Sequence, residues 1–202
     1  MATSATPHGF RPVGLLGGGS WSDSVRHMKV TNSYGTSIFY GDVVKVVAAG
    51  TVEKDSGTTT MTPVGIFLGC SYTDPNSNQP TYSQMWTAST SATDIKAYVC
   101  DDPNVVFQAQ GDATLAQTAL GNNVAVVQTA GSTSIGHSKN AINSSTIATT
   151  KTLPVLIIGF VDGPNSSVGD SFTDVLCKFN SGGDATGDSW NRPSAALKKK
   201  LP

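Results

Sequence analysis

The sequence is poor in the residues that build exposed helices. Only 13% of its 202 residues are charged, and Glu53 is the single glutamate beside ten lysines. Exposed helices are commonly stabilised by Glu–Lys pairs three or four positions apart, so a protein with many surface helices is disfavoured. Serine and threonine instead supply 23 and 24 residues, and valine is far commoner than leucine. This composition is typical of a β-rich protein with many loops.

Two further absences narrow the functional classes. A net charge of −1 excludes a strongly basic nucleic-acid-binding protein, and no apolar run approaches the roughly 18 residues that cross a membrane. Residues 1–9 also lack the charged and apolar regions of a signal peptide. We therefore expect no nucleic acid and no membrane among the partners, and synthesis in a cytoplasm.

The chain has three widely spaced cysteines, Cys70, Cys100 and Cys177, none of them in a CxxC pair. An odd number without paired spacing favours neither a disulfide framework nor a zinc site. Each cysteine lies in or beside an apolar run, where cysteine commonly acts as a small buried hydrophobic residue. The sequence therefore predicts three free, buried thiols.

Composition divides the chain into three parts. They are an extended N-terminal arm (residues 1–24), a β-rich core domain (25–181) and a flexible C-terminal tail (182–202). Pro7, Pro12 and Gly17–Gly19 disfavour a helix or a long strand in the arm. The arm is therefore expected to lie outside the strands of the core.

Within the core, apolar or β-branched runs alternate with turn residues at short intervals. Strands are predicted at 37–40, 43–47, 51–54, 61–72, 81–87, 94–100, 104–110, 123–128, 153–161 and 172–179. Gly65 and Gly69 indicate a bulge or a close backbone crossing. The one predicted helix covers Asp112–Leu120, with Asp112 as its N-cap and Gly121 after its end. The expected fold is mainly β: a compact β-barrel or sandwich with one short helix.

Catalytic chemistry has little support in the sequence. The three histidines stand in no recognisable catalytic motif (His8, His27, His137). Asp101 and Asp102 could bind a cation together with Asp112, but a turn in which an aspartate caps the backbone explains the first two more simply. We therefore expect no enzymatic activity, no catalytic residue, no metal and no cofactor.

The arm carries spaced apolar residues that it cannot bury by itself. Six residues are therefore predicted to contact a partner: Phe10, Arg11, Val13, Leu15, Leu16 and Trp21. Phe10, Leu15 and Leu16 are expected to fill shallow pockets, and Arg11 is expected to meet a carboxylate.

Five segments, in order along the chain, resemble one protein family. They are Gly9–Val13, Phe39–Lys45, Pro63–Gly69, Asp101–Gln110 and Leu156–Val161, of which DDPNVVFQAQ (101–110) is the most specific. Over roughly residues 9–180 the chain resembles the capsid decoration, or cement, proteins of tailed bacteriophages. The resemblance implies a compact β-barrel, often a homotrimer, that sits on the outer face of the capsid and bridges neighbouring major capsid subunits without enzymatic activity.

The same resemblance implies the partners and the location. The partners would be the major capsid protein and further copies of the chain, and the site of action the capsid surface of a virion assembled in the host cytoplasm. Two features depart from the family pattern: His8 replaces an apolar residue, and the chain after Asn180 is longer than the pattern needs. A head–tail, tail or head-fibre component that touches host surface glycans is the alternative, and a depolymerase or lyase is a third.

Overall fold

The computed structural model describes residues 4–22 and 24–180, and this part of the chain is mainly β, with antiparallel sheets in a sandwich-like arrangement. The first sheet has the order β1 (Arg11–Leu15), β10 (Val105–Gln110), β14 (Asp174–Phe179), β13 (Val155–Phe160), β11 (Asn123–Val127), β12 (Ala141–Ala148). The second has the order β2 (Val25–Met28), β9 (Lys96–Cys100), β6 (Gly65–Thr73), β4 (Val43–Val46), β5 (Val52–Lys54), with β7 (Pro80–Ser83) also paired to β6. A small third sheet joins β3 (Ile38–Phe39) and β8 (Met85–Trp86). The prediction of a mainly β fold is confirmed.

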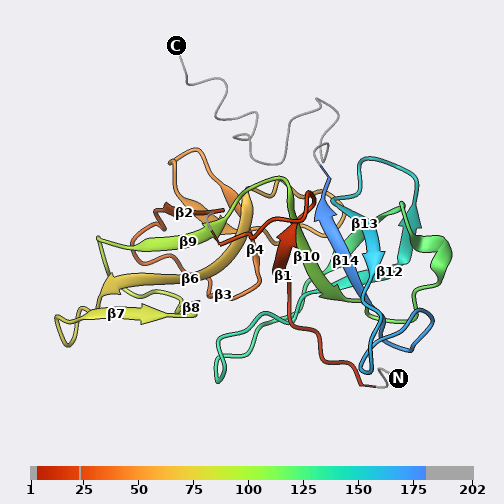
Figure 1. The fold of residues 1–202 in the computed structure, drawn as a ribbon. Coiled ribbons are helices and arrows are strands. Elements are labelled where there is room, and N and C mark those ends of the chain that lie inside the picture. The colour runs from red at the N-terminus through yellow and green to blue at the C-terminus, as the bar shows by residue number, and fades with distance from the viewer. Residues whose placement is uncertain (1–3, 23, 181–202) are drawn as a thin grey trace, which may run out of the picture.

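The two large sheets lie side by side in Figure 1, and each curls until its outer strands approach the opposite edge. In the first sheet, Gly111 after β10 forms a bridge with Ile142 of β12. In the second, Val52 of β5 forms a bridge with Val30, just after β2, and the Val52 N–H donates to the Lys29 carbonyl at 2.8 Å. These bridges bring together strands that are not neighbours within each sheet.

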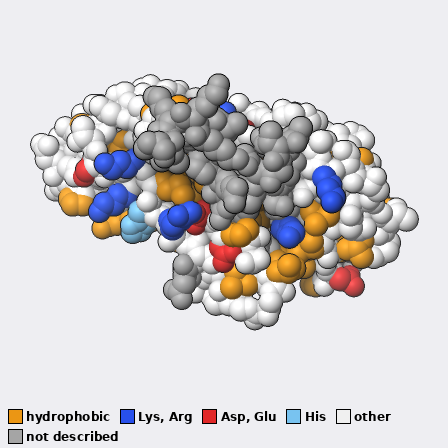
Figure 2. All heavy atoms as spheres, turned by 90° about the horizontal axis from the view of Figure 1, so that it is seen from above, with side chains coloured by type: hydrophobic (Ala, Val, Ile, Leu, Met, Phe, Trp, Pro, Cys, Tyr) orange, Lys and Arg blue, Asp and Glu red, His pale blue; other side chains and the backbone are white. Residues whose placement is uncertain are grey.

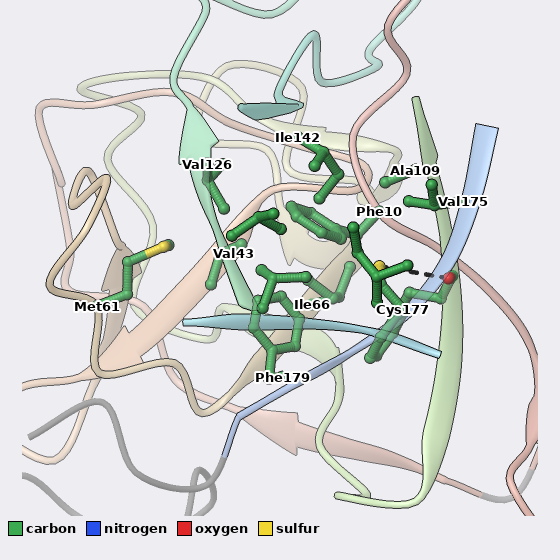
Figure 3. Close-up of a cluster of buried hydrophobic side chains, with 14 of the residues drawn as sticks. Phe10, Val43, Met61, Ile66, Ala109, Val126, Ile142, Val175, Cys177 and Phe179 are labelled. Atoms are coloured by element: carbon green, nitrogen blue, oxygen red, sulfur yellow. Dashed lines mark hydrogen bonds between the residues drawn. The ribbon is translucent and has the colours of Figure 1, made fainter. Parts of the chain in front are cut away.

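The core consists of two clusters that share the strands of the second sheet. Successive residues of a strand point to opposite faces. Val43, Ile66 and Cys100 therefore join the cluster inside the first sheet, whereas their neighbours Val44 and Phe67 join the cluster inside the second. Figure 3 shows the first cluster, where side chains from both sheets meet around Phe10. This shared layer holds the two sheets together.

Glycines in β6 allow its close contact with β9. A Cβ on Gly65 would collide with the backbone carbonyl of Cys100, and the pairing with β9 shifts register between Phe67 and Gly69. Gly69 has φ 136°, which L side chains rarely adopt. The prediction of a bulge or a close backbone crossing at these two glycines is confirmed.

The predicted helix at Asp112–Leu120 is wrong. Only Gln117–Ala119 form one turn of 3₁₀ helix, and Ala116 is extended at φ −83°, ψ 161°. Asp112 does not cap it: its backbone N–H donates to the Ile142 carbonyl, and its Oδ1 accepts hydrogen bonds from the Ser144 N–H and hydroxyl. Bonds to the neighbouring strand therefore override the local helix signal.

The expectation that the arm lies outside the strand ladder is also wrong. Residues 11–15 form β1, which pairs antiparallel with β10, so that Arg11 faces Gln108 and Leu15 faces Val105. Every predicted strand range overlaps an observed strand, whereas β2 and the Ser/Thr-rich β12 lie outside the predicted ranges. The tail predicted at 182–202 lies outside the described residues.

Candidate partner-binding surface

Strand β1 forms one edge of the first sheet, and a bulge exposes one of its side chains. The pairing of β1 with β10 shifts register between Pro12 and Gly14, so Val13 is the extra residue. The Val13 side chain is 46% exposed. Within the described part of the chain, β1 has a strand partner on one side only. This edge therefore presents an uncovered apolar side chain.

The glycine run after β1 forms a tight turn that exposes a second apolar side chain. The Leu15 N–H donates to the Gly19 carbonyl at 3.0 Å, and the Gly18 N–H donates back to the Leu15 carbonyl at 2.8 Å. The Leu16 N–H donates to the carbonyl of Asn104 at 2.9 Å, which fastens the turn to the loop between β9 and β10. Leu16 is 55% exposed and lines a shallow hollow with Leu15 and Asn104. Val13 and Leu16 are the exposed apolar members of the predicted set, and we call them the edge pair.

Phe10 does not belong to any exposed surface, so the prediction that it contacts a partner is wrong. Its side chain is fully buried, and its ring centroid lies 5.1 Å from that of Phe179. Gly9 fixes this position: it has φ 72°, and a Cβ there would lie 2.6 Å from the Gly41 carbonyl oxygen. Leu15 and Trp21 are half-buried against the same core cluster. These residues anchor the N-terminal segment to the chain's own core.

Arg11 is half-buried and lines a pocket with His8, His137 and Lys139. Sequence reasoning named Arg11 but missed the other three, because a loop far along the chain brings two of them to the N-terminal segment. No local motif in the sequence indicates that these residues lie close together.

The aspartates considered for a cation each have a protein partner. Asp102 Oδ1 accepts a hydrogen bond from the Asn104 N–H at 2.8 Å, which confirms the predicted turn at this residue. Asp101 is instead buried and forms an ion pair with Arg26, which the turn interpretation did not predict. Among the described residues, no group of three or more His, Cys, Asp or Glu side chains is placed to hold a metal ion.

The three cysteines are free and buried, as predicted. Burial raises the pKa of Cys70 and of Cys100 to about 12, and Asp101 beside Cys100 adds to the shift there. Burial also raises the pKa of Cys177 far above its ordinary value. The thiolate is the nucleophilic form, so these thiols are unreactive near neutral pH.

We expect the native protein to resist alkylation by iodoacetamide at pH 8, because all three thiols are buried and protonated. After denaturation without reductant, mass spectrometry should count three alkylated cysteines. A count below three would reveal a disulfide, and rapid labelling of the native protein would contradict the burial.

One face of the molecule is shown in Figure 2. On this face, charged side chains and several hydrophobic patches lie among a larger area of uncharged polar side chains and backbone. The exposed large hydrophobic residues include the edge pair, Tyr82 and Ile135. Contact with another macromolecule can cover such patches.

Comparison with protein-family models, curated proteins and solved structures found no match. Within the described part of the chain, no helix is long and apolar enough to span a membrane. The family resemblance therefore rests on the five sequence segments, and the fold shows where these lie. Two of them, Gly9–Val13 and Asp101–Gln110, are neighbours, since β1 pairs with β10.

Proposed function

We propose that this protein is a non-enzymatic structural protein of a phage virion, which decorates the outer face of the capsid and bridges major capsid subunits. The observation that carries the proposal is the order of the five resembling segments, which spans roughly residues 9–180. Two of these segments form the β1–β10 pair, and Leu156–Val161 contains most of β13 in the same sheet. Three of the five resembling segments thus lie in the sheet whose edge carries Val13.

The edge pair offers the contact that such a role needs. Val13 and Leu16 project from one short segment at a sheet edge, and each is about half exposed. Complete burial of a fully exposed valine or leucine side chain contributes about 1.5–3 kcal/mol, so covering the exposed half of each contributes about half as much. In a homotrimer the contact would be repeated three times, so that individually weak contacts give strong attachment.

Co-sedimentation with empty capsids of the phage that encodes this chain tests the proposal. We expect the protein to sediment with the capsids, and the double variant Val13→Ser, Leu16→Ser to bind at least about tenfold more weakly. The matched control is Ile147→Ser, Val168→Ser, which removes two other exposed apolar side chains and should bind as the unchanged protein does. No co-sedimentation at all would contradict capsid decoration.

One further hollow favours a second candidate function. In this function the protein would be a head–tail, tail or head-fibre component that touches host glycans. This hollow holds about 380 Å³, and Tyr72, Asp74, Asn76, Ser89 and Ser91 line it. An aromatic ring with amide, carboxylate and hydroxyl groups suits a sugar ring, which has an apolar face and a polar edge. Gold-labelled antibody on intact particles would separate the two candidates, since a tail component would be labelled away from the head.

A further inference from the structure

A pocket of about 390 Å³ lies beside the start of β1. The pocket is lined by the N-terminal segment Ala5–His8, by Arg11 and by residues of the loop from Ile135 to Lys139. A backbone hydrogen bond holds the loop in place: the Ser138 N–H donates to the Tyr40 carbonyl at 2.9 Å. The pocket is therefore built by ordered parts of the chain that are distant in sequence.

Four basic side chains line this pocket. Arg11 and Lys139 make no ion pair and no side-chain hydrogen bond with any residue that the structure describes. His8 lies beside Arg11, and the ring of His137 lies 5.4 Å from that of Tyr40. Two permanent cations thus share one small pocket without a bonded counter-ion among the described residues.

The acids near the pocket do not balance these charges. Asp42 Oδ1 accepts a hydrogen bond from the Ser138 hydroxyl at 2.7 Å. Asp42 Oδ2, however, lies 2.9 Å from Lys54 Nζ. Asp42 is therefore neutralised by its own partner.

Asp174 is a second acid near the pocket. It lies close enough to His8 to raise the pKa of that imidazole, and its Oδ2 accepts a hydrogen bond from Gln108 Nε2 at 2.9 Å. One carboxylate against Arg11 and Lys139 leaves an excess of positive charge even when both histidines are neutral. The pocket is therefore suited to an anion.

The walls indicate the kind of anion. Ala5, Pro7 and Ile135 give the pocket apolar sides, and Ile135 is 60% exposed. A carboxylate on a short aliphatic stem would place its charge at Arg11 and its methylene groups against these sides. A phosphate ion would gain nothing from the apolar part.

We propose that this pocket binds the carboxylate of an acidic side chain from a partner protein, with Arg11 and Lys139 as its direct ligands. Only the source of the carboxylate, a partner protein rather than a free small acid, rests on the proposed function. The chemistry of the pocket stands on its own geometry.

Acidic pH should strengthen the binding. Burial, followed by the charge of Arg11, lowers the pKa of His8, so its imidazole is neutral at pH 8. Asp174 already raises the pKa of His8 in the free protein. A bound carboxylate adds to this effect and further favours the charged imidazole. Glutamate remains ionised at pH 6, so the ligand does not lose its charge over this range.

The test uses the peptide acetyl-Gly-Glu-Gly-amide and the ring signals of the three histidines in NMR spectra of the full chain. We expect the signals of His8 and His137 to shift saturably, more strongly at pH 6 than at pH 8. His27 serves as the internal reference, because it lies on β2 in the other sheet, against Tyr98. Equal shifts of all three histidines would overturn the proposal, since they would reflect a general salt effect.

Charge variants complete the test. Arg11→Gln and Lys139→Gln should each weaken peptide binding at least about fivefold. Lys151→Gln, near Asn180 at the opposite end of β14 from Asp174, is the matched control and should bind unchanged. Thermal melting verifies that each variant folds, and Lys139→Gln carries the test if Arg11→Gln does not fold, because Lys139 is exposed. Undiminished binding by a folded Lys139→Gln variant would overturn the assignment.

Two competing probes define the ligand. Tighter binding of inorganic phosphate than of the peptide would overturn the carboxylate assignment. Tighter binding of free glutarate than of the peptide would overturn the protein source and leave the pocket as a small-acid site. All these measurements use the free protein, so their failure is distinguishable from a failure to co-sediment with capsids.

Discussion

Replacing Phe10 with alanine should lower the free energy of unfolding by about 3–5 kcal/mol. Its side chain is fully buried among residues of both sheets, with its ring against Phe179 (Figure 3). Truncation removes the transfer free energy of a large side chain and leaves a cavity that the surrounding strands cannot fill completely. Urea denaturation of the purified variant measures the loss.

The matched control is Val13→Ala, three positions along the same segment. Val13 is 46% exposed, so its truncation should change the free energy of unfolding by no more than about 0.5 kcal/mol. Removing residues 1–22 should destabilise the protein at least as much as Phe10→Ala, because it also uncovers the edge of β10. An unchanged melting temperature after removal of residues 1–22 would instead support the interpretation of this segment as an independent arm.

The interpretation of residues 1–24 as an arm failed because backbone requirements differ between the edge and the middle of a sheet. Pro12 lacks an N–H group, which disfavours a central strand but not an edge strand that bonds on one side. Pro12 faces Phe107 in the β1–β10 pair and is buried there. The sequence shows the proline but not which edge of a sheet receives it.

The strands of the core could be predicted because turn residues lie between nearly all of the short β-branched runs. β12 was missed because its central residues, 143–146, are polar and break up its apolar pattern. Its pairing with β11 also uses a side-chain hydroxyl: Thr146 Oγ1 accepts a hydrogen bond from the Ala125 N–H at 2.9 Å. The helix expected at Asp112–Leu120 failed for the related reason that Asp112 bonds to β12 rather than to the turn that follows it. Local propensity is weak where such non-local bonds exist.

The candidate surface, like the strands, could be predicted from the sequence only in part. The sequence indicates that apolar residues near the N-terminus need cover, but it does not show which of them stay exposed. The bulge in β1 exposes Val13, and the turn after β1 exposes Leu16. The pocket around Arg11 depends on His137 and Lys139, which the Tyr40–Ser138 backbone bond brings to the N-terminal segment. Contacts between segments this far apart in the chain cannot be recognised from local motifs.

A buried ionic network at the same junction holds these distant segments together. Asp42 is fully buried, and its Oδ2 accepts a hydrogen bond from the Phe39 N–H at 3.0 Å and pairs with Lys54. Its Oδ1 accepts hydrogen bonds from the Ser138 hydroxyl and from Asn140 Nδ2 at 3.2 Å. One carboxylate therefore connects the β3–β4 turn, β5 and the entry to β12.

Asp42→Ala should lower the free energy of unfolding by about 3–5 kcal/mol, because it leaves the Lys54 ammonium group without its partner in a largely buried site. It also deprives the Ser138 hydroxyl and the Asn140 amide of an acceptor. Urea denaturation of Asp42→Ala, Lys54→Met and the double variant gives a double-mutant cycle. The double variant should be more stable than the sum of the two single losses implies, since neither charge is then buried alone. Additive losses would show that Asp42 and Lys54 act independently, and that the hydrogen bonds from Phe39, Ser138 and Asn140 alone account for the contribution of Asp42 to this junction.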